Sequence, residues 1–92
     1  QAKTLFPYTT LFRSLGISKK ILDAEHLEFE LLKPLIRETI RKALEAPDPS
    51  VVQTGPARRG DENTIERHLD FLEKYPAWQG LYEILTESIR RR

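Results

Sequence analysis

A fifteen-residue segment rich in proline and glycine constrains how this chain can fold. Residues 46–60 read APDPSVVQTGPARRG and hold three prolines and two glycines. Proline removes a backbone donor and clashes with the preceding helical turn, and glycine favours turns, so we expect no regular structure over most of this segment. Connections this long in a small domain are usually functional or mobile. The sequence therefore predicts regular elements on either side of the segment.

Two helices are predicted before this break. Apolar residues at i, i+4 and i+7 predict a helix over about residues 17–26. Residues 28–45 carry a wide apolar face with acidic residues at the start and basic residues at the end, which is typical of a long amphipathic helix. Pro34 lies within this pattern, and we expect it either to kink the helix or to place the regular part after it.

Two more helices are predicted after the break, over about residues 61–75 and 78–90, with Pro76 separating them. Asp61 suits the N-cap of the first of these helices. The predicted buried stripe of that helix consists of Ile65, Leu69 and Leu72. Four amphipathic helices without a convincing strand indicate an all-α class, a small bundle of about four helices.

Composition narrows the functions that are open to the chain. Hydrophobic residues make up 39% and charged residues 32%, a balance that suits a folded helical protein. The formal net charge of +1 implies no general attraction to nucleic acid or anionic membrane. The absence of cysteine excludes disulfides and thiolate ligands, and the two histidines lack a ligand spacing, so we expect no metal site. No apolar run is long enough to predict a membrane span.

The first fourteen residues are predicted to lie outside the fold. Pro7 disfavours a helix interior, and the apolar residues of segment 4–14 match neither one helical face nor strand alternation, which leaves an unpartnered edge strand as the alternative. The stretch TLFPYTTLFRS resembles the in-frame translation of a common short-read sequencing adapter. That resemblance implies a non-native leader on a metagenomic fragment, with Leu15 as the first genuine residue. If the leader is ordered, the side chains expected to cover apolar surface are Phe6, Leu11 and Phe12.

The segment QTGPARRGDENTIERH, residues 53–68, holds the candidates for chemistry. A helix N-terminus with arginines nearby can attract phosphate or carboxylate groups. At 100° per residue, Asp61, Thr64 and His68 fall on the same side as the buried stripe, so we expect His68 to point inward or toward an interface. An inward histidine near arginine and aspartate can donate a proton or contact a substrate.

The same residues also have ordinary structural explanations. Asp61 can act only as an N-cap, and the Gly-Pro dipeptide before it only as a turn. The two adjacent arginines can be solvated charges, and His68 can be a hydrogen-bonded core residue. From the residues alone, both the functional and the structural interpretation stay open.

Most of the chain resembles a domain of larger enzymes. The motifs are LLKPLI, QTGPARRGD, TIERHL and LYEILTESI, spread over about residues 17–91. They resemble the C-terminal helical domain of unknown function in Rossmann-like, NAD(P)-dependent oxidoreductases, a group similar to pyrroline-5-carboxylate reductase, ketopantoate reductase and 6-phosphogluconate dehydrogenase. The resemblance implies that residues 15–92 are a partial C-terminal domain, which in the parent protein forms a homodimer, binds substrate and closes the active site of a missing N-terminal Rossmann domain.

The resemblance also implies where the chemistry lies. NAD(P) would be bound by the parent protein in the cytoplasm, with no cofactor-binding residue in this fragment, and the fragment alone is not expected to be an enzyme. His68 and Arg58 are the candidates for catalysis. The substrate-binding positions that the resemblance implies are Thr54, Gly55, Pro56, Arg58, Asp61, Thr64 and His68.

An alternative from another class is a self-contained helical interaction module with weak affinity for nucleic acid. The tracts ARRG and RRR suggest it, and the last two predicted helices could mimic a helix-turn-helix. The near-neutral net charge argues against it. A salt titration of DNA binding separates the two hypotheses, because phosphate contacts make binding strongly salt-dependent.

Overall fold

The computed structural model describes the backbone of residues 2–91 and the side chains of residues 8–91. No strand occurs in residues 2–91, and four of the α-helices are long, so the prediction of an all-α class is confirmed. The elements are α1 (Ala2–Ala24), a 3-10 helix (Phe29–Leu31), α2 (Lys33–Glu45), a second 3-10 helix (Pro49–Val52), α3 (Pro56–Arg59), α4 (Glu62–Leu72) and α5 (Pro76–Arg91).

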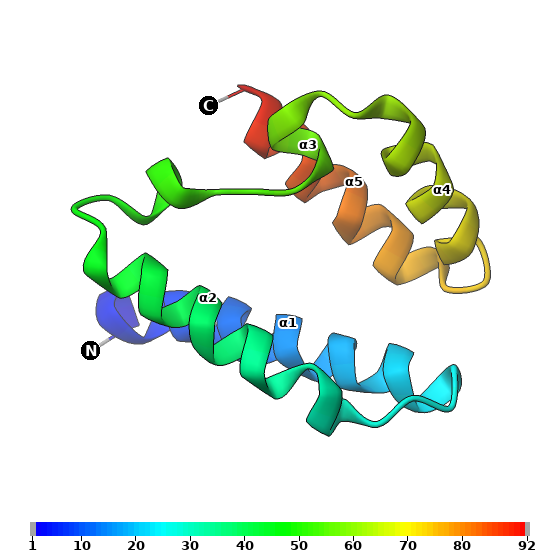
Figure 1. Cartoon of the computed structure of the whole chain (residues 1–92), viewed down its shortest axis with the longest axis horizontal. Helices are drawn as coiled ribbons and strands as arrows, with labels where there is room; N and C mark the ends of the chain where they lie inside the picture. The colour runs from blue at the N-terminus through cyan, green and yellow to red at the C-terminus, as the bar shows by residue number, and fades with distance from the viewer. Residues whose placement is uncertain (1, 92) are drawn as a thin grey trace. The chain divides into compact units, whose positions relative to one another are not determined.

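The chain divides into two compact units. Unit 1 is Gln1–Leu44 and contains α1 and nearly all of α2, and unit 2 is Glu45–Arg92 and contains α3, α4 and α5 (Figure 1). None of the helices in residues 2–91 has both the length and the apolar character that a bilayer span requires.

Helix α1 begins much earlier than predicted. It starts at Ala2 and runs through Pro7, so the expectation that the opening stretch forms no regular element is wrong for its backbone. Pro7 lies near the helix start, where its missing N–H costs a single intrahelical bond. Further along the helix, Leu11 and Leu15, one turn apart, line a groove that α1 shares with α2, and Leu11 is still 43% exposed. Phe12 is 70% exposed and covers little surface, and the Phe6 side chain lies outside the described residues.

Helix α1 ends in a left-handed turn at His26, two residues past its last helical residue. His26 has a φ of 60°, and the N–H of Leu27 donates to the carbonyl of Leu22 at 2.8 Å. This six-to-one bond is the mark of a Schellman motif, in which a histidine here occupies the position that glycine usually takes. The helix therefore stops at Ala24 rather than at the predicted residue 26.

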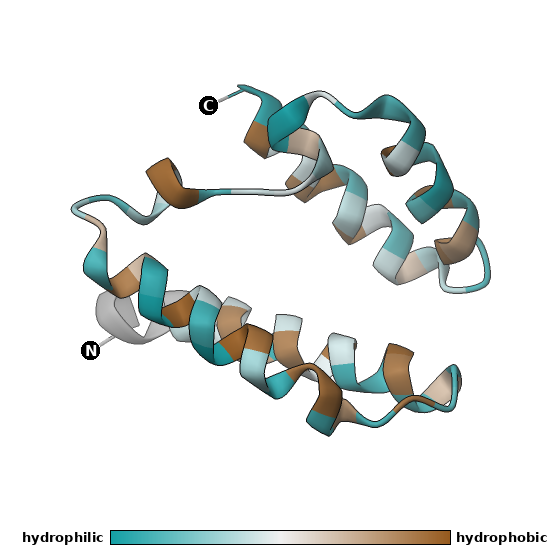
Figure 2. Ribbon diagram, in the orientation of Figure 1, coloured by the Kyte–Doolittle hydropathy of each residue, from teal (hydrophilic) through white to brown (hydrophobic). Residues whose placement is uncertain are grey.

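Helix α2 begins just before Pro34, which matches the second of the two predicted outcomes. The predicted helix over residues 28–45 is divided into a 3-10 helix, Phe29–Leu31, and the regular helix from Lys33. Pro34 is then the second helical residue, where its missing N–H would have no intrahelical partner. The residues after it form an uninterrupted amphipathic helix, in which hydrophobic and hydrophilic positions alternate along the ribbon (Figure 2).

The apolar face of α2 is only partly covered within unit 1. A groove of about 220 Å³ lies between α1 and α2. It is lined by Leu11, Leu15, Leu32, Leu35, Ile36, Thr39 and Ile40. Outside or at the edge of this groove, large side chains stay open to solvent, and Leu31 and Leu44 are 72% and 80% exposed. Unit 1 thus presents large apolar side chains to solvent on and beside α2.

The proline-rich segment is more regular than predicted. Pro49 opens a 3-10 helix, where the side chain of Asp48 accepts a hydrogen bond from the backbone N–H of Ser50 at 3.0 Å. Pro56 opens α3, a single helical turn. Proline fits the first position of a helix because its φ is already helical and its N–H is not needed there. The expectation of an irregular segment overlooked that two of its three prolines stand at such positions.

Unit 2 contains the buried core of the described residues. Ile65 and Leu72 on α4 are 4% and 7% exposed, as predicted, and Leu69 is half-buried. The amide of Gln79 on α5 donates to the Leu69 carbonyl at 2.8 Å and ties the start of α5 to α4. Helix α4 ends at Leu72, three residues earlier than predicted, and α5 starts at Pro76, two residues earlier than predicted.

Candidate functional site

The site predicted from the sequence begins at the turn before α3. Gly55 has φ 101° and ψ 173°, a conformation that is essentially restricted to glycine. Its carbonyl accepts the N–H of Arg59 at 3.2 Å, so Gly55 caps the helix that Pro56 opens. The Gly-Pro pair is therefore explained by the turn, and each of its residues has a conformational reason to be there.

Helix α3 ends in a Schellman motif at Gly60. Gly60 is left-handed, with φ 70° and ψ 30°, as a glycine at this position commonly is. The N–H of Asp61 donates to the carbonyl of Pro56 at 2.9 Å, and the N–H of Gly60 points to the carbonyl of Ala57 at 3.4 Å. Asp61 closes this motif with its N–H and is also the residue that precedes α4.

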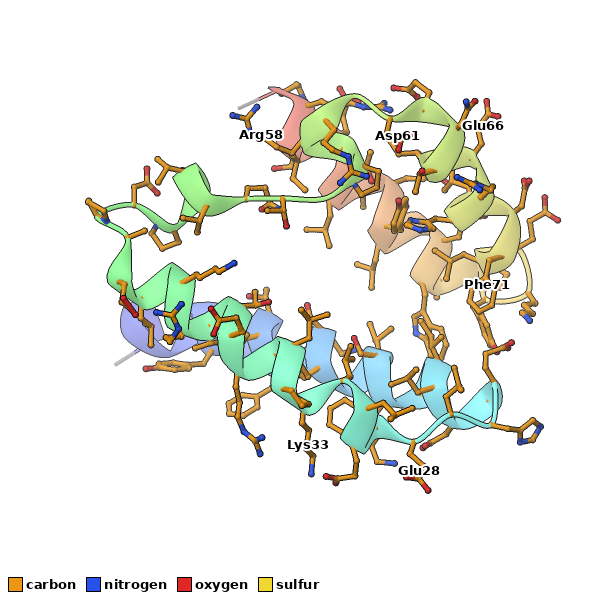
Figure 3. All side chains as sticks on the ribbon, in the orientation of Figure 1. Glu28, Lys33, Arg58, Asp61, Glu66 and Phe71 are labelled. Atoms are coloured by element: carbon orange, nitrogen blue, oxygen red, sulfur yellow. The ribbon has the colours of Figure 1, made fainter. Side chains whose placement is uncertain are left out.

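Asp61 is the N-cap of α4, which confirms the prediction for this residue. Its Oδ1 accepts the backbone N–H of Thr64 at 3.1 Å, and its Oδ2 accepts the Thr64 hydroxyl at 2.7 Å. Arg59 lies at the edge of the same carboxylate, with Nη2 3.4 Å from Oδ2. Arg67 in turn donates to the Thr64 Oγ1 at 3.3 Å. The result is a polar network on the first turn of α4, placed on the ribbon in Figure 3 by the Asp61 label.

These contacts favour the ionised form of the cap. The two hydrogen bonds from Thr64, first from its hydroxyl and then from its backbone N–H, lower the pKa of Asp61, and Arg59 adds to the effect. The carboxylate is thus held as an anion and already has its acceptor positions occupied. Asp61 is suited to fix the start of α4 rather than to exchange a proton.

His68 lies one turn beyond Thr64 on α4 and contacts Tyr82 on α5. Its Nδ1 is 2.7 Å from the Tyr82 hydroxyl, and the two rings meet edge to face with centroids 5.5 Å apart and planes at 83°. Of the two predicted orientations, the inward one is wrong, because the His68 side chain is exposed; the orientation toward an interface with a partner stays a prediction. His68 does face α5, and its contact with that helix is the one between Nδ1 and the Tyr82 hydroxyl.

Tyr82 has a more enclosed position than His68. Burial raises the pKa of the Tyr82 phenol, and this effect is opposed in part by a hydrogen bond from the Thr86 hydroxyl and by the charge of Arg90. Thr86 is 8% exposed and lies one turn further along α5. The phenol therefore keeps its proton at neutral pH, and it connects a buried hydroxyl to an exposed imidazole.

The structure brings together only some of the predicted substrate-binding residues. Asp61 and Thr64 are directly bonded, and His68 follows on the same face of α4. Thr54 is separate, and its carbonyl accepts the side-chain amide of Gln53 at 2.9 Å. Arg58 is exposed on α3 (Figure 3), and no hydrogen bond or ion pair to it occurs among the described side chains. The site has a polar core around Asp61 and an exposed rim.

Several residues that form contacts in this region are not predicted from the sequence. Tyr82 is not among the predicted site residues although it contacts His68, and Arg59 rather than Arg58 is the arginine beside Asp61. Arg90 forms an ion pair with Glu62 at 2.5 Å, which joins the end of α5 to the start of α4. A match between the polar stripes of α4 and α5 could have suggested Tyr82, but the sequence does not say which faces of the two helices meet.

The described side chains form no metal cluster, and Arg90 and Arg91 pair with acidic residues. Among the described side chains, no three histidine, cysteine or acidic residues converge as metal ligands would. Arg90 also approaches Glu87 at 4.0 Å, and Arg91 pairs with Glu87 at 3.5 Å. Acidic partners thus neutralise part of the terminal arginine tract, which weakens the argument for nucleic-acid binding.

The sequence matches a known family over most of its length. The family model of a domain of unknown function, DUF2520, matches residues 9–89. The chain belongs to the DUF2520 family. The match begins inside the predicted leader, before Leu15, and includes every predicted site residue. None of the curated proteins compared with the chain matches it.

A solved structure gives the DUF2520 chain a larger context. It is similar to a Bacteroides fragilis protein whose crystal structure is described as that of a "putative NADP oxidoreductase". The identity is 41% and the TM-score is 0.88, over 96% of this chain. The match covers 34% of the Bacteroides protein, so the chain spans about a third of that relative's length. The fold of this chain therefore occurs as one part of an oxidoreductase-like protein.

Proposed function

We propose that this chain is the C-terminal helical domain of an NAD(P)-dependent oxidoreductase-like protein, and that it helps to close an active site built with a Rossmann domain. The observation that carries the proposal is the similarity to the Bacteroides fragilis protein, which covers nearly all of this chain but only about a third of that relative. A helical domain that belongs to a larger enzyme in this way commonly supplies substrate contacts and an interface.

The dinucleotide is assigned to the rest of the parent protein. A Rossmann site needs a strand, a glycine-rich turn and the N-terminus of the following helix. Residues 2–91 contain no strand, and the Gly-Pro turn before α3 follows a 3-10 helix and opens a helix of a single turn. These residues do not fit an NAD(P) site. Their contribution would be to the substrate side of the reaction.

The polar face of α4 is the part of the chain that we assign to the substrate side. Asp61 and Thr64 fix the start of the helix, and His68 presents an exposed imidazole one turn later. Arg58 adds an exposed guanidinium on the preceding helix. An imidazole and a guanidinium suit a substrate that carries oxygen atoms or negative charge.

The apolar face of α2 is assigned to an interface in the parent protein. Leu35 and Leu44 on this helix are 62% and 80% exposed, and Leu31 on the preceding 3-10 helix is 72% exposed. Contiguous exposed apolar surface commonly marks an interaction site. The Rossmann domain and a second subunit of a homodimer are the partners that the family resemblance implies. Either would bury these side chains and stabilise unit 1.

A chimera tests the proposed function. Residues 9–89 of this chain replace the matching third of the Bacteroides fragilis protein, and NADPH is titrated into the chimera and into the 92-residue chain alone. We expect the chimera to bind NADPH, as judged by cofactor fluorescence, and the chain alone to bind none. Tight binding by the chain alone, or a chimera that folds yet does not bind NADPH while the parent does, would contradict the proposal.

The same chimera tests the assignment of the substrate side. His68→Ala and Arg58→Ala are compared with Glu66→Ala, an exposed change on α4 that serves as the matched control (Figure 3). We expect the first two to lower NADPH oxidation with a panel of carbonyl and imine compounds while NADPH affinity and the unfolding midpoint stay unchanged. Equal activity in all three variants would remove these residues from the site.

A further inference from the structure

The hydrogen bond between His68 and Tyr82 has a donor and an acceptor, and the family match does not say which residue is the donor. Hydrogen bonds of a neutral imidazole are asymmetric, because one nitrogen donates and the other accepts. The 2.7 Å contact involves Nδ1, which leaves Nε2 as the nitrogen available to a ligand. The relative donor strengths of the phenol and the imidazole decide which partner of this contact supplies the proton.

The phenol of Tyr82 sets the direction of this contact. A phenol is a better proton donor than a neutral imidazole, and an imidazole nitrogen is the better acceptor, so a protonated Tyr82 donates across the 2.7 Å contact. Burial raises the pKa of Tyr82, which keeps that proton in place at neutral pH. The phenol then donates to Nδ1 of His68. A neutral His68 accepts at Nδ1 and must therefore carry its own proton on Nε2.

The edge-to-face contact of the two rings limits the freedom of the imidazole. The planes meet at 83° with centroids 5.5 Å apart, a favourable geometry for an aromatic pair. Together with the hydrogen bond, this contact holds the orientation of an otherwise exposed side chain. The exposed edge of the ring keeps the same direction without a ligand, which reduces the entropy lost on binding.

We propose that Tyr82 is a positioning residue that holds Nδ1 of His68, so that the Nε2–H donates a hydrogen bond to an oxygen atom of the substrate. The inference deepens the proposed function and rests on it for the identity of the ligand. The chemistry that fits is a carbonyl or carboxylate oxygen, since the neutral imidazole presents a donor there. His68 would touch the substrate, and Tyr82 would act through His68.

The tautomer of His68 is the direct test, and it requires no substrate. Long-range ¹H–¹⁵N spectra of the 92-residue chain are recorded near pH 9, where unperturbed imidazoles are neutral. We expect His68 to show the Nε2–H tautomer alone. His26, the other histidine of the chain, lies in the exposed turn after α1 and serves as the internal reference with a mixture of tautomers. An Nδ1–H tautomer at His68 would overturn the inference.

Tyr82→Phe and a matched control separate positioning from packing. Phenylalanine keeps the ring contact and removes the hydroxyl, so we expect the His68 signals to shift to the mixture seen for His26. Tyr8→Phe, which removes an exposed phenol from unit 1, is expected to change neither histidine. His68 signals that stay the same in Tyr82→Phe would contradict the proposal.

Two further measurements keep the outcomes distinct. If Tyr82→Phe does not fold, the tautomer of His68 in the wild-type chain still decides, because an Nδ1–H tautomer there overturns the inference. In the chimera, Tyr82→Phe is expected to lower kcat/KM by about tenfold, the effect of one lost hydrogen bond, with NADPH affinity unchanged. A chimera that binds no NADPH contradicts the proposed function alone, whereas unchanged kcat/KM in a binding chimera contradicts the role of Tyr82.

Discussion

The two units of this chain are built from similar amphipathic helices but are stabilised in different ways. In unit 2, side chains that lie far apart in the sequence meet: Gln79 bonds to Leu69, and Arg90 pairs with Glu62. In unit 1, the ion pairs Lys19–Asp23, Lys33–Glu30 and Arg41–Glu38 join residues three or four positions apart. Such local pairs stabilise each helix alone and contribute little to packing between helices.

The difference shows that an apolar stripe specifies a helix but not a partner. The stripe of α4 is buried at Ile65 and Leu72, because the turns around α3 and at Pro76 return the chain onto itself. The stripe of α2 has as many large apolar residues and leaves most of them open. Short turns with defined caps decide which stripe is covered within the chain.

The largest expected effect comes from comparing a buried leucine of the α4 stripe with an exposed leucine of the α2 stripe. Leu72→Ala should destabilise unit 2 by about 2–5 kcal/mol, because it empties a buried position. Leu35→Ala, a matched change at a side chain that is 62% exposed, should cost less than about 1 kcal/mol in unit 1. Urea unfolding followed by circular dichroism measures both. Similar losses for the two variants would mean that the stripe of α2 is covered in solution.

The turn before α3 provides the next test. Gly55→Ala places a Cβ where no atom lies within 4 Å, so no clash is expected, but its φ of 101° is unsuited to alanine. We expect a loss of about 1–3 kcal/mol from backbone strain alone. Thermal unfolding gives the value. A neutral substitution would show that the turn relaxes and that unit 2 does not depend on it.

The N-cap of α4 connects stability to pH. The folded-state pKa of Asp61 is lowered, so its contribution is fully present above the unfolded value of about 3.9 and is lost as the pH falls through the folded pKa. Asp61→Asn keeps a capping oxygen but removes the charge, so its difference from the wild type should shrink toward zero in acid. Unfolding midpoints between about pH 6 and pH 2 measure this trend. If the difference in unfolding midpoint between the wild type and Asp61→Asn does not change with pH, the cap stabilises α4 through hydrogen bonds alone and not through its charge.

The smallest effect compares one glycine in each unit. Gly16 and Gly80 lie inside α1 and α5, and a Cβ on either would meet no atom within 4 Å. Each change to alanine should therefore stabilise its helix by about 0.5–1 kcal/mol. Thermal unfolding of the two single variants measures the gains. A gain for Gly80→Ala without one for Gly16→Ala would show that α1 contributes less to the folded state than α5.

What the sequence predicted correctly depended on local rules. Asp61 as an N-cap, Pro34 at the start of a helix and the stripe of Ile65 and Leu72 each follow from residues within a few positions of one another. Caps and periodicity are read from the chain itself, so the helices around these residues were placed to within a few residues.

What the sequence missed depended on contacts between elements. Helix α1 runs through Pro7 despite the unfavourable local signal, and Leu11 and Leu15 further along it line a groove shared with α2. The phase of His68 on α4 was correct, but its exposure depends on how much of the ring the side chain of Tyr82 covers. No periodicity in one helix can show how its neighbour is rotated, so the partners of the candidate site could not be predicted.

The adjoining caps at Gly60 and Asp61 have a consequence for how this family can vary. The end of α3 and the start of α4 share this junction, since Asp61 closes one motif with its N–H and opens the next with its side chain. One extra residue here would break both motifs at once and rotate every later position of α4 by about 100°. Insertions and deletions among homologues should therefore be absent between these two residues, whereas the chain near Pro47 can vary in length.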